Sequence, residues 1–283
     1  MDIGNRIISS LDETQDNDSR PVRATGCAGC RGGAAFPVNF SMAFQPIVAP
    51  ARGAVFAYEA LVRGEDGAGA GTVLSAIDEE NRYAFDQRCR VKAIELASRL
   101  GIADQNAFVS INFMPNAIYR PEVCIRTTFE TARREGFPTS NIIFEFTEEQ
   151  QIREPERVRE ILKAYREMGF MTAIDDFGAG FSGLNLLADF QPDFIKLDMV
   201  LIRGLDADRS RRAIVTGILA MCEELGVRPI AEGIETEAEY CTLVDLGVDL
   251  FQGYLFARPA FERLPQPNVP ELARRLVKRG AEQ

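Results

Sequence analysis

Short apolar runs alternate with longer amphipathic stretches along this chain from about residue 42 onward. Each apolar run has about the length of a β-strand, and several runs carry apolar side chains on consecutive positions. Consecutive apolar positions are typical of parallel strands that are buried on both faces. The pattern predicts strands at residues 42–48, 55–62, 107–113, 141–147, 170–175, 193–198, 227–231 and 248–252.

Helical patterns lie between these runs, and most of them end at a glycine. Residues 85–100 place apolar side chains at helical spacing, and Gly101 follows as a typical helix C-terminus. Pro155 predicts the start of another helix, because proline is favoured in the first helical turn. The sequence therefore predicts helices at residues 85–100, 155–168, 209–225 and 237–246, with a short terminal helix at 271–279.

The repeated order of helix, glycine and strand is typical of α/β units. About eight strands in 283 residues favour a closed (β/α)8 barrel, a fold of about 250 residues, over an open sheet. Only residues 49–54 join the first two strands, and this connection is too short for a parallel crossover. We therefore expect a TIM-like (β/α)8 barrel with an irregular, antiparallel first strand.

The two ends of the chain lack this periodicity. Residues 1–36 are polar and glycine-rich, so we expect a flexible N-terminal tail, a barrel at 37–268 and a C-terminal helix or tail at 269–283. The tail holds Cys27 and Cys30 in a CxxC pattern, which is at most half of a zinc site. A redox pair, a zinc shared at a dimer contact and no role at all remain open for these two cysteines.

The chain contains no histidine, which excludes Ser-His-Asp triads, Cys-His pairs and His-ligated metals. The net charge of −10 argues against a nucleic-acid polymer or an acidic membrane surface as a partner. The N-terminal residues lack the apolar core of a signal peptide, and no apolar run approaches the length of a membrane helix. With six scattered cysteines, these features predict a cytoplasmic protein.

Polar side chains stand where nearly every predicted strand ends. In a (β/α)8 barrel the C-terminal ends of the strands meet at one rim, and this rim carries the active site. Chance explains one polar strand end but accounts poorly for many acids at the same rim. The residues concerned are Glu59, Asn112, Glu145, Asp175, Asp176, Lys196, Asp198, Glu232, Glu235 and Gln252.

Repulsion among these acids predicts bound cations. Two carboxylates about 4 Å apart repel by about 4 kcal/mol at an effective dielectric constant of about 20. Oxygen ligands without histidine favour Mg²⁺ or Mn²⁺, with Ca²⁺ as an inhibitory competitor. The adjacent Asp175 and Asp176 can hold two ions at one strand end, an arrangement used for phosphodiester hydrolysis. The ions would also let an acidic protein bind an anionic substrate.

Glu59, Ala60 and Leu61 form the tripeptide that names the EAL domains, a family of cyclic di-GMP phosphodiesterases. The tripeptide alone is too short to identify a family, but further motifs occur in the family's order from about residue 42 to residue 259. The sequence therefore resembles this family over nearly all of the chain after the tail. These motifs are FQPIV at 44–48, Asn112 with Pro115, EFTE at 145–148, DDFG at 175–178, IKLD at 195–198, AEGIE at 231–235 and QGY at 252–254.

The resemblance implies that two metal ions share Asp175. Asp176 would help to hold the second ion, and Glu232 would lie in or next to the metal shell and belong to the catalytic group. The first ion would have four ligands: Glu59, Asn112, Glu145 and Asp175.

The resemblance also implies roles in catalysis and substrate binding. Lys196 would hold or deprotonate the attacking water, while Glu235 and Gln252 would support that water and the phosphate. Four further residues would bind the substrate: Gln45 at a guanine, Arg63 at a phosphate, and Pro115 and Asp198.

The expected product is linear pGpG, and the expected partners are cyclic di-GMP, a second copy of the chain in a homodimer, and a regulatory protein. Glu148 would anchor the loop after Asp176. This loop departs mildly from the family's pattern, with Gly183 where a serine is usual, but no predicted ligand is missing.

Single residues also allow simpler interpretations. Lys196 could form a structural ion pair, and Asp176 could cap the segment after it. Glu148 and Glu235 could be solvated surface acids. Residues 178–183 match a GxGxxG pattern, but the two aspartates before them would repel a pyrophosphate, so we interpret the glycines as a flexible loop.

Two other functions compete with hydrolysis. A receptor would bind cyclic di-GMP in the same pocket without cutting it, and a missing ligand or lysine would favour this alternative. An interaction protein of the same family would dock on a regulator.

Overall fold

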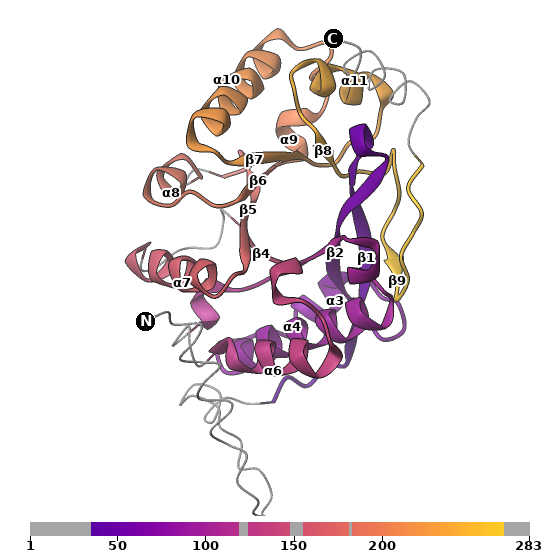
Figure 1. Cartoon of the computed structure of the whole chain (residues 1–283), viewed down its shortest axis with the longest axis vertical. Helices are drawn as coiled ribbons and strands as arrows, with labels where there is room; N and C mark the ends of the chain where they lie inside the picture. The colour runs from indigo at the N-terminus through magenta and orange to yellow at the C-terminus, as the bar shows by residue number, and fades with distance from the viewer. Residues whose placement is uncertain (1–34, 119–123, 148–154, 181–182, 269–283) are drawn as a thin grey trace, which may run out of the picture.

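The computed structural model describes residues 35–118, 124–147, 155–180 and 183–268 of the 283-residue chain. Its strands close into a barrel, in which β2 to β8 follow each other in order and β1 lies between β8 and β2 (Figure 1). The strands are β1 (Phe40–Ala49), β2 (Ala54–Gly64), β3 (Phe108–Asn112), β4 (Ile142–Thr147), β5 (Met171–Phe177), β6 (Phe194–Leu197), β7 (Arg228–Ala231), β8 (Leu250–Phe251) and β9 (Ala260–Phe261).

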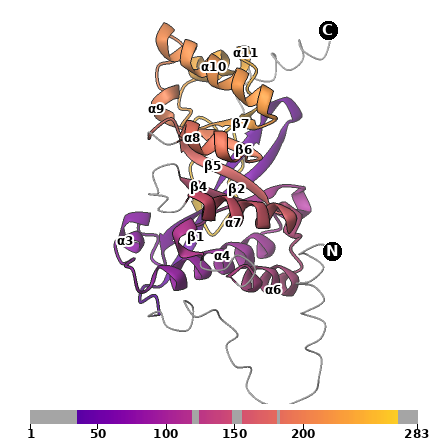
Figure 2. The ribbon, with the colours of Figure 1, turned by 90° about the vertical axis from the view of Figure 1, so that its left-hand side faces the viewer.

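Helices surround this barrel on its outside, as the two views in Figures 1 and 2 show. The α-helices are α3 (Ala70–Leu74), α4 (Arg82–Arg99), α6 (Arg126–Glu135), α7 (Pro155–Glu167), α8 (Gly183–Asp189), α9 (Met199–Ile202), α10 (Arg209–Leu225) and α11 (Glu237–Asp245). Short 3-10 helices lie at η1 (Pro50–Arg52), η2 (Ala103–Gln105), η3 (Pro115–Ala117) and η4 (Thr139–Asn141). Within the described ranges, no helix is both long and apolar enough to cross a bilayer.

The TIM-like barrel with an antiparallel first strand is confirmed. β1 pairs antiparallel with both β2 and β8, whereas β2 to β8 run parallel to one another. The turn between β1 and β2 is η1, which ends at Gly53 with a φ of 62°. Such a left-handed residue favours glycine, and it lets the chain reverse without a crossover.

Between residues 35 and 268, the predicted helices and strands are present where the structure describes the chain, with shifted ends and several additions. The last predicted strand, residues 248–252, shortens to β8 at Leu250–Phe251. Helices α3, α6, α8 and α9 and strand β9 were not predicted, because each is short or carries few apolar side chains. Cys27, Cys30 and the predicted helix at 271–279 lie outside the described residues, so the predicted tail boundaries stay predictions.

The barrel interior consists of two layers. Because side chains of a strand alternate between its faces, residues two positions apart point into the barrel together. Phe194 precedes Lys196 in this way, and Ile143 precedes Glu145. The N-terminal layer is an apolar plug that contains Ile47, Ala49, Ala57, Ile143, Ala173, Phe194, Ile230 and Leu250. The polar layer above it faces the C-terminal strand ends.

The outward faces of the strands pack against the helices through aromatic side chains. Phe144 of β4 lies with its ring centroid 5.0 Å from that of Tyr165 on α7 and 5.1 Å from that of Phe170. Phe113 contacts both Phe144 and Tyr165, at 5.8 and 5.6 Å. Such fully buried aromatic groups contribute strongly to stability, so they fix the strands that carry the polar layer.

Gly253 allows the loops after β7 and β8 to meet backbone to backbone. A Cβ at this position would lie 2.1 Å from the carbonyl oxygen of Ile234 and 2.3 Å from its nitrogen. Because both contacts are backbone atoms, Gly253→Ala should lower the free energy of unfolding by about 1–3 kcal/mol or more. Denaturant unfolding measures this change.

Gly217 on α10 provides the matched control, since a Cβ there would meet no atom within 4 Å. We expect Gly217→Ala to be neutral or to stabilise by about 0.5–1 kcal/mol. Equal unfolding free energies for the two variants would contradict the close approach at Gly253.

Candidate active site

The polar layer of the barrel gathers side chains from seven strands or strand ends. Strand register places Glu59 beside Ser110 and Asn112 beside Glu145. Asp175 comes from β5 and Lys196 from β6, and the two remaining members follow directly after β7 and β8. We call this group the polar ring: Glu59, Asn112, Glu145, Asp175, Lys196, Glu232 and Gln252.

Lys196 occupies the centre of the polar ring and is 1% exposed. Its Nζ lies 2.7 Å from Glu232 Oε1, 3.0 Å from Glu145 Oε2, 3.0 Å from Asp175 Oδ1 and 3.5 Å from Glu59 Oε2. An ammonium group offers three donors, so these four carboxylates exceed what it can satisfy. The negative charge of the ring is therefore only partly neutralised by Lys196.

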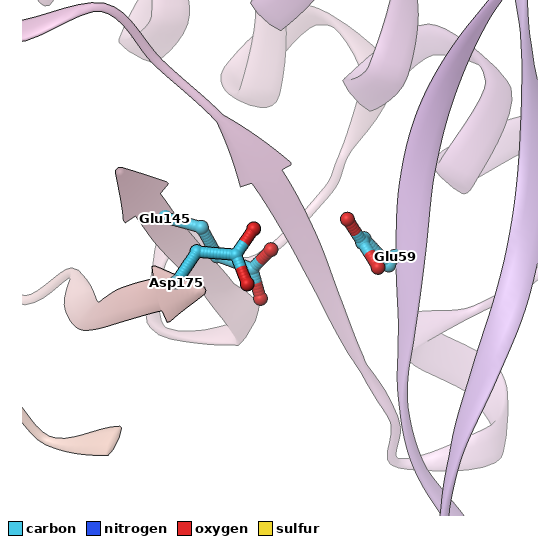
Figure 3. Close-up of side chains that lie close together, drawn as sticks. All are labelled: Glu59, Glu145 and Asp175. Carbon is cyan, nitrogen blue, oxygen red and sulfur yellow. The ribbon is translucent and has the colours of Figure 1, made fainter. Parts of the chain in front are cut away.

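The carboxylates are held by neighbouring side chains. Glu59 accepts hydrogen bonds from Asn112 Nδ2 at 3.1 Å and from Gln252 Nε2 at 2.8 Å. Glu145 accepts from the hydroxyl of Ser110. Figure 3 shows Glu145 and Asp175 side by side, with Glu59 facing them from β2. These contacts orient the carboxylate oxygens toward a common centre.

Burial and like charge shift the protonation of the ring. Burial raises the pKa of Glu145, and the charges of Glu59 and Asp175 raise it further, against the opposing effects of Lys196 and Ser110. Burial also raises the pKa of Glu232 well above its usual range, and Asp175 and Glu59 add to this. Burial alone would lower the pKa of Lys196, but Asp175, Glu145, Glu232 and Glu59 together raise it well above its ordinary value. The surrounding carboxylates therefore favour the ammonium form of Lys196.

Two groups of three carboxylates have the spacing of metal ligands, and they share one member. The first group is Glu59, Glu145 and Asp175, and the second is Asp175, Asp176 and Glu232; within each group the ligand oxygens lie within 4.8 Å of one another. Buried carboxylates that one ammonium cannot neutralise favour a further cation. Oxygen donors of this kind suit Mg²⁺ or Mn²⁺, so the residues fit a divalent metal site.

Asp176 adopts a strained backbone conformation at the edge of the ring. Its φ is 54°, which is uncommon for a residue other than glycine and which recurs at functional sites. Its backbone N–H donates to Asp175 Oδ1 at 3.0 Å. Burial, followed by the charge of Asp175, raises the pKa of Asp176 to about 6. The two adjacent aspartates thus point in directions that a regular strand would not allow.

A cavity of about 360 Å³ opens beside the polar ring. This volume lies within the range of small-molecule sites. Its walls come from β2, β3 and α4 and include Glu59, Asn112, Asp175, Asp176 and Arg63. A ligand in this cavity would therefore contact both carboxylate groups.

The predicted substrate residues divide between this cavity and its surroundings. Arg63 lines the cavity, and its Nη1 donates to its neighbour's carbonyl, Val62 O, at 2.7 Å. Gln45 is buried on β1 opposite Glu59 and donates to Ala257 O at 3.1 Å. Pro115 begins η3, three residues after Asn112.

Asp198 and Glu235 lie outside the polar ring. Asp198 caps α9, where its Oδ1 accepts from Val200 N at 2.7 Å. Glu235 forms an ion pair with Arg203 at 3.0 Å, and its side chain is 47% exposed. Their predicted roles stay predictions, and Glu148 lies outside the described residues.

Three polar residues near the site were not predicted. Ser110 stands two positions before Asn112 on β3, so strand alternation alone would have placed it in the ring. Arg203 and Asp86 carry no signal of this kind. Arg203 reaches Glu235 from another loop, and Asp86 lies on a helix that only the fold brings to the cavity wall.

Known proteins are similar to this chain in sequence and in fold. The family model described as "EAL domain" matches residues 37–259. The blue light- and temperature-regulated antirepressor BluF of Escherichia coli is 31% identical over 234 residues, which are 83% of this chain and 58% of that protein. The cyclic di-GMP phosphodiesterase RocR of Pseudomonas aeruginosa is 37% identical over 126 residues, or 44% of this chain and 32% of that protein. The chain spans less than two thirds of the length of both relatives.

Two solved structures superpose well on the barrel. A standalone EAL protein from Vibrio cholerae, in its c-di-GMP-bound form, is 51% identical with a TM-score of 0.79, covering 83% of this chain and 98% of that one. Klebsiella pneumoniae BlrP1, in complex with manganese and cyclic di-GMP, is 37% identical with a TM-score of 0.74, covering 81% of this chain and 58% of that one.

Proposed function

This chain belongs to the EAL domain family, and from this premise we propose that it is a metal-dependent phosphodiesterase that hydrolyses cyclic di-GMP to linear pGpG. The observation that carries the proposal is the pair of carboxylate groups that share Asp175 beside a ligand-sized cavity. The names of RocR and of the two nucleotide-bound structures support the substrate.

Two divalent ions, Mg²⁺ or Mn²⁺, fit the two carboxylate groups. Glu59, Glu145 and Asp175 would hold one ion together with the amide oxygen of Asn112. Asp175, Asp176 and Glu232 would hold the other. When bound, such ions polarise the phosphate and stabilise the charge of an in-line displacement.

Lys196 and Glu232 would handle the attacking water. Lys196 Nζ lies within 3.5 Å of four carboxylates at the centre of the ring, and it would hold the attacking water through a hydrogen bond to the water oxygen. Glu232 lies 2.7 Å from Lys196 Nζ, so its carboxylate is placed to take the proton that the water loses. The water oxygen then forms its bond to phosphorus as the bond from phosphorus to the 3′ oxygen breaks. The 3′ oxygen takes a proton from solvent, which leaves pGpG with a 5′ phosphate and a 3′ hydroxyl.

The remaining predicted residues would place the nucleotide. Arg63 lines the cavity beside Glu59 and would bind a phosphate with its guanidinium group. Gln45 would contact a guanine. Gln252 would keep Glu59 oriented through the hydrogen bond of 2.8 Å while it faces the phosphate. Pro115 and Asp198 would also bind the substrate, and Glu235 would support the attacking water and the phosphate.

A product assay tests this function directly. Purified protein is incubated with cyclic di-GMP and Mg²⁺ or Mn²⁺, and the nucleotides are separated by chromatography. We expect pGpG to appear at the expense of the substrate. Binding of cyclic di-GMP without any pGpG would contradict the enzyme proposal and support a receptor.

Metal exchange gives a second expected result. Chelation with EDTA should stop pGpG formation, and added Mg²⁺ or Mn²⁺ should restore it. Ca²⁺ should permit nucleotide binding with little turnover, because it takes more ligands at longer distances than the smaller ions. Unchanged pGpG formation in EDTA would show that hydrolysis does not require a metal ion.

A regulator-binding role is the second candidate, because BluF, a relative over 83% of this chain, is named as an antirepressor. Such a role would not require turnover. A pull-down of one regulatory protein that survives Glu59→Gln would support it. If Glu59→Gln loses both metal binding and the regulatory protein, that protein depends on the metal and nucleotide site for its binding.

We also propose that this chain forms a homodimer and that it lies in the cytoplasm. Helices α9 and α10 contact each other and expose Met199, Val200 and Ile214. Exposed apolar side chains on adjoining helices favour burial against a second copy. Light scattering during gel filtration should give twice the mass of 31.4 kDa.

A further inference from the structure

Helix α4 carries a buried ion pair beside the active-site cavity. Asp86 Oδ2 lies 2.8 Å from Arg90 Nη2, and each residue is 2% exposed. Asp86 also lines the cavity that contains Glu59 and Asn112. A buried ion pair is weak evidence for stability, since apolar residues of similar volume often replace such pairs without loss. The burial of this pair beside the cavity therefore indicates a role other than stabilising the fold.

Asp86 holds the backbone that follows Asn112. Strand β3 ends at Asn112, and the next residue, Phe113, donates its N–H to Glu145 O at 2.9 Å. The N–H of Met114 then turns away from the sheet and donates to Asp86 Oδ1, also at 2.9 Å. Two anchors, one from β4 and one from α4, thus determine the direction of the chain immediately after Asn112.

Arg90 keeps the carboxylate of Asp86 in place. Besides its ion pair, its Nη1 donates to the carbonyl of Cys124 and to Thr128 Oγ1, both at 3.4 Å. Burial raises the pKa of Asp86, whereas the charge of Arg90 and the N–H of Met114 lower it. The side chain of Asp86 is therefore held on both sides, by Arg90 and by the loop.

We propose that Asp86 is a positioning residue, which holds the segment after Asn112 so that the Asn112 amide keeps its place at Glu59 and at the metal site. This inference rests on the proposed function of the polar ring. Asn112 reaches Glu59 through a single hydrogen bond of 3.1 Å, so a shift of its backbone would move the amide oxygen as well. Residues that orient metal ligands typically contribute about 10- to 100-fold to metal affinity or activity.

Two double variants separate positioning from folding. Asp86→Leu with Arg90→Met removes both charges and leaves the N–H of Met114 without an acceptor. Asp86→Asn with Arg90→Met also removes both charges but keeps an oxygen for Met114. Thermal unfolding is measured first, and then the affinity for Mn²⁺ by calorimetry without nucleotide, followed by kcat and KM.

The leucine variant should lose about 10- to 100-fold in Mn²⁺ affinity and in kcat/KM, and the asparagine variant should recover most of that loss. Equal Mn²⁺ affinities for the two double variants, or an unchanged affinity in the leucine variant, would overturn the proposal. If the unchanged chain binds Mn²⁺ but forms no pGpG, the proposed function fails, while the affinities still test the role of Asp86.

Asp193 provides a matched control at the opposite end of the barrel. Its Oδ2 accepts from the backbone N–H of Thr172 at 2.8 Å, the same kind of contact that Asp86 makes. Asp193→Ala should lower the melting temperature without changing Mn²⁺ affinity, and a comparable loss of affinity would overturn the proposal.

If a double variant does not fold, hydrogen exchange at the backbone N–H of Met114 tests the proposal. In the unchanged, metal-free protein, the N–H of Met114 should exchange slowly, because a buried carboxylate accepts it. Exchange as fast as that of an exposed loop would overturn the proposal.

Discussion

Glu59→Gln will abolish hydrolysis of cyclic di-GMP while leaving the metal-free fold intact. Glutamine keeps the shape of the side chain but has one acceptor oxygen in place of two, so it can accept from Asn112 or from Gln252 while the other partner turns its amide. It also removes one anionic metal ligand. Loss of several kcal/mol of transition-state stabilisation corresponds to a fall in turnover of about 10³-fold or more. Steady-state measurement of pGpG formation in Mn²⁺ gives the comparison.

The stability of this variant should move in the opposite direction from its activity. Glu59 adds negative charge to a ring in which the Lys196 ammonium faces four carboxylates, so its neutralisation relieves repulsion. The melting temperature in EDTA should therefore not fall, whereas the increase caused by Mn²⁺ should shrink.

Glu156→Gln is the control, because this acid on α7 is 81% exposed and contacts only Arg159 among the described ion pairs. Its activity should equal that of the unchanged chain. Normal turnover by Glu59→Gln would show that the metal assignment is wrong.

Lys196→Met will slow the chemical step far more than it weakens nucleotide binding. The ammonium acts on the attacking water, so we expect kcat to fall by about 10²- to 10⁴-fold, the usual effect of losing a group that handles a reacting proton or its water. The dissociation constant for cyclic di-GMP in Ca²⁺, measured by calorimetry, should change little. A parallel loss of binding and turnover would contradict the role of Lys196 at the water.

The same variant should depend on metal for its stability. Removing one partner from a buried ion network destabilises by about 3–5 kcal/mol, because the remaining charges stay buried without compensation. Divalent ions would then supply the missing positive charge, so Mn²⁺ should raise the melting temperature of Lys196→Met more than that of the unchanged chain. Lys163→Met, at a lysine that is 77% exposed, should show neither effect.

The sequence predicted the barrel from its repeated order of helix, glycine and strand, and most of the polar ring from the polar residues that end the strands. The strands also show why these residues meet in one layer. Each strand repeats an apolar residue and, two positions later, a polar one, as in Phe194 with Lys196 and Ile143 with Glu145. In parallel strands this spacing places all polar members in one layer. The short link after residue 48 likewise predicted the antiparallel β1, because it leaves no room for a crossover.

Features that depend on contacts between distant segments could not be predicted. Asp86 and Arg90 have the spacing of an ordinary surface ion pair on a helix, and the packing of α4 against α6, β3 and β1 buries them. Glu235 follows a strand end in the sequence, but Arg203 from the loop after α9 holds its carboxylate. The left-handed conformation of Asp176 also has no local signal, since aspartate adopts it only occasionally.

The apolar plug and the polar ring are adjacent layers of the same strands, and this arrangement separates two kinds of sequence change. Substitutions among the ring residues can alter the ligand set or the charge while the plug, from Ile47 to Leu250, still closes the barrel beneath it. One scaffold can thus give rise to hydrolases, receptors and docking proteins through changes in a single layer. A one-residue insertion inside a strand would turn the inward-facing side chains of both layers outward, so length variation among relatives should be confined to the loops.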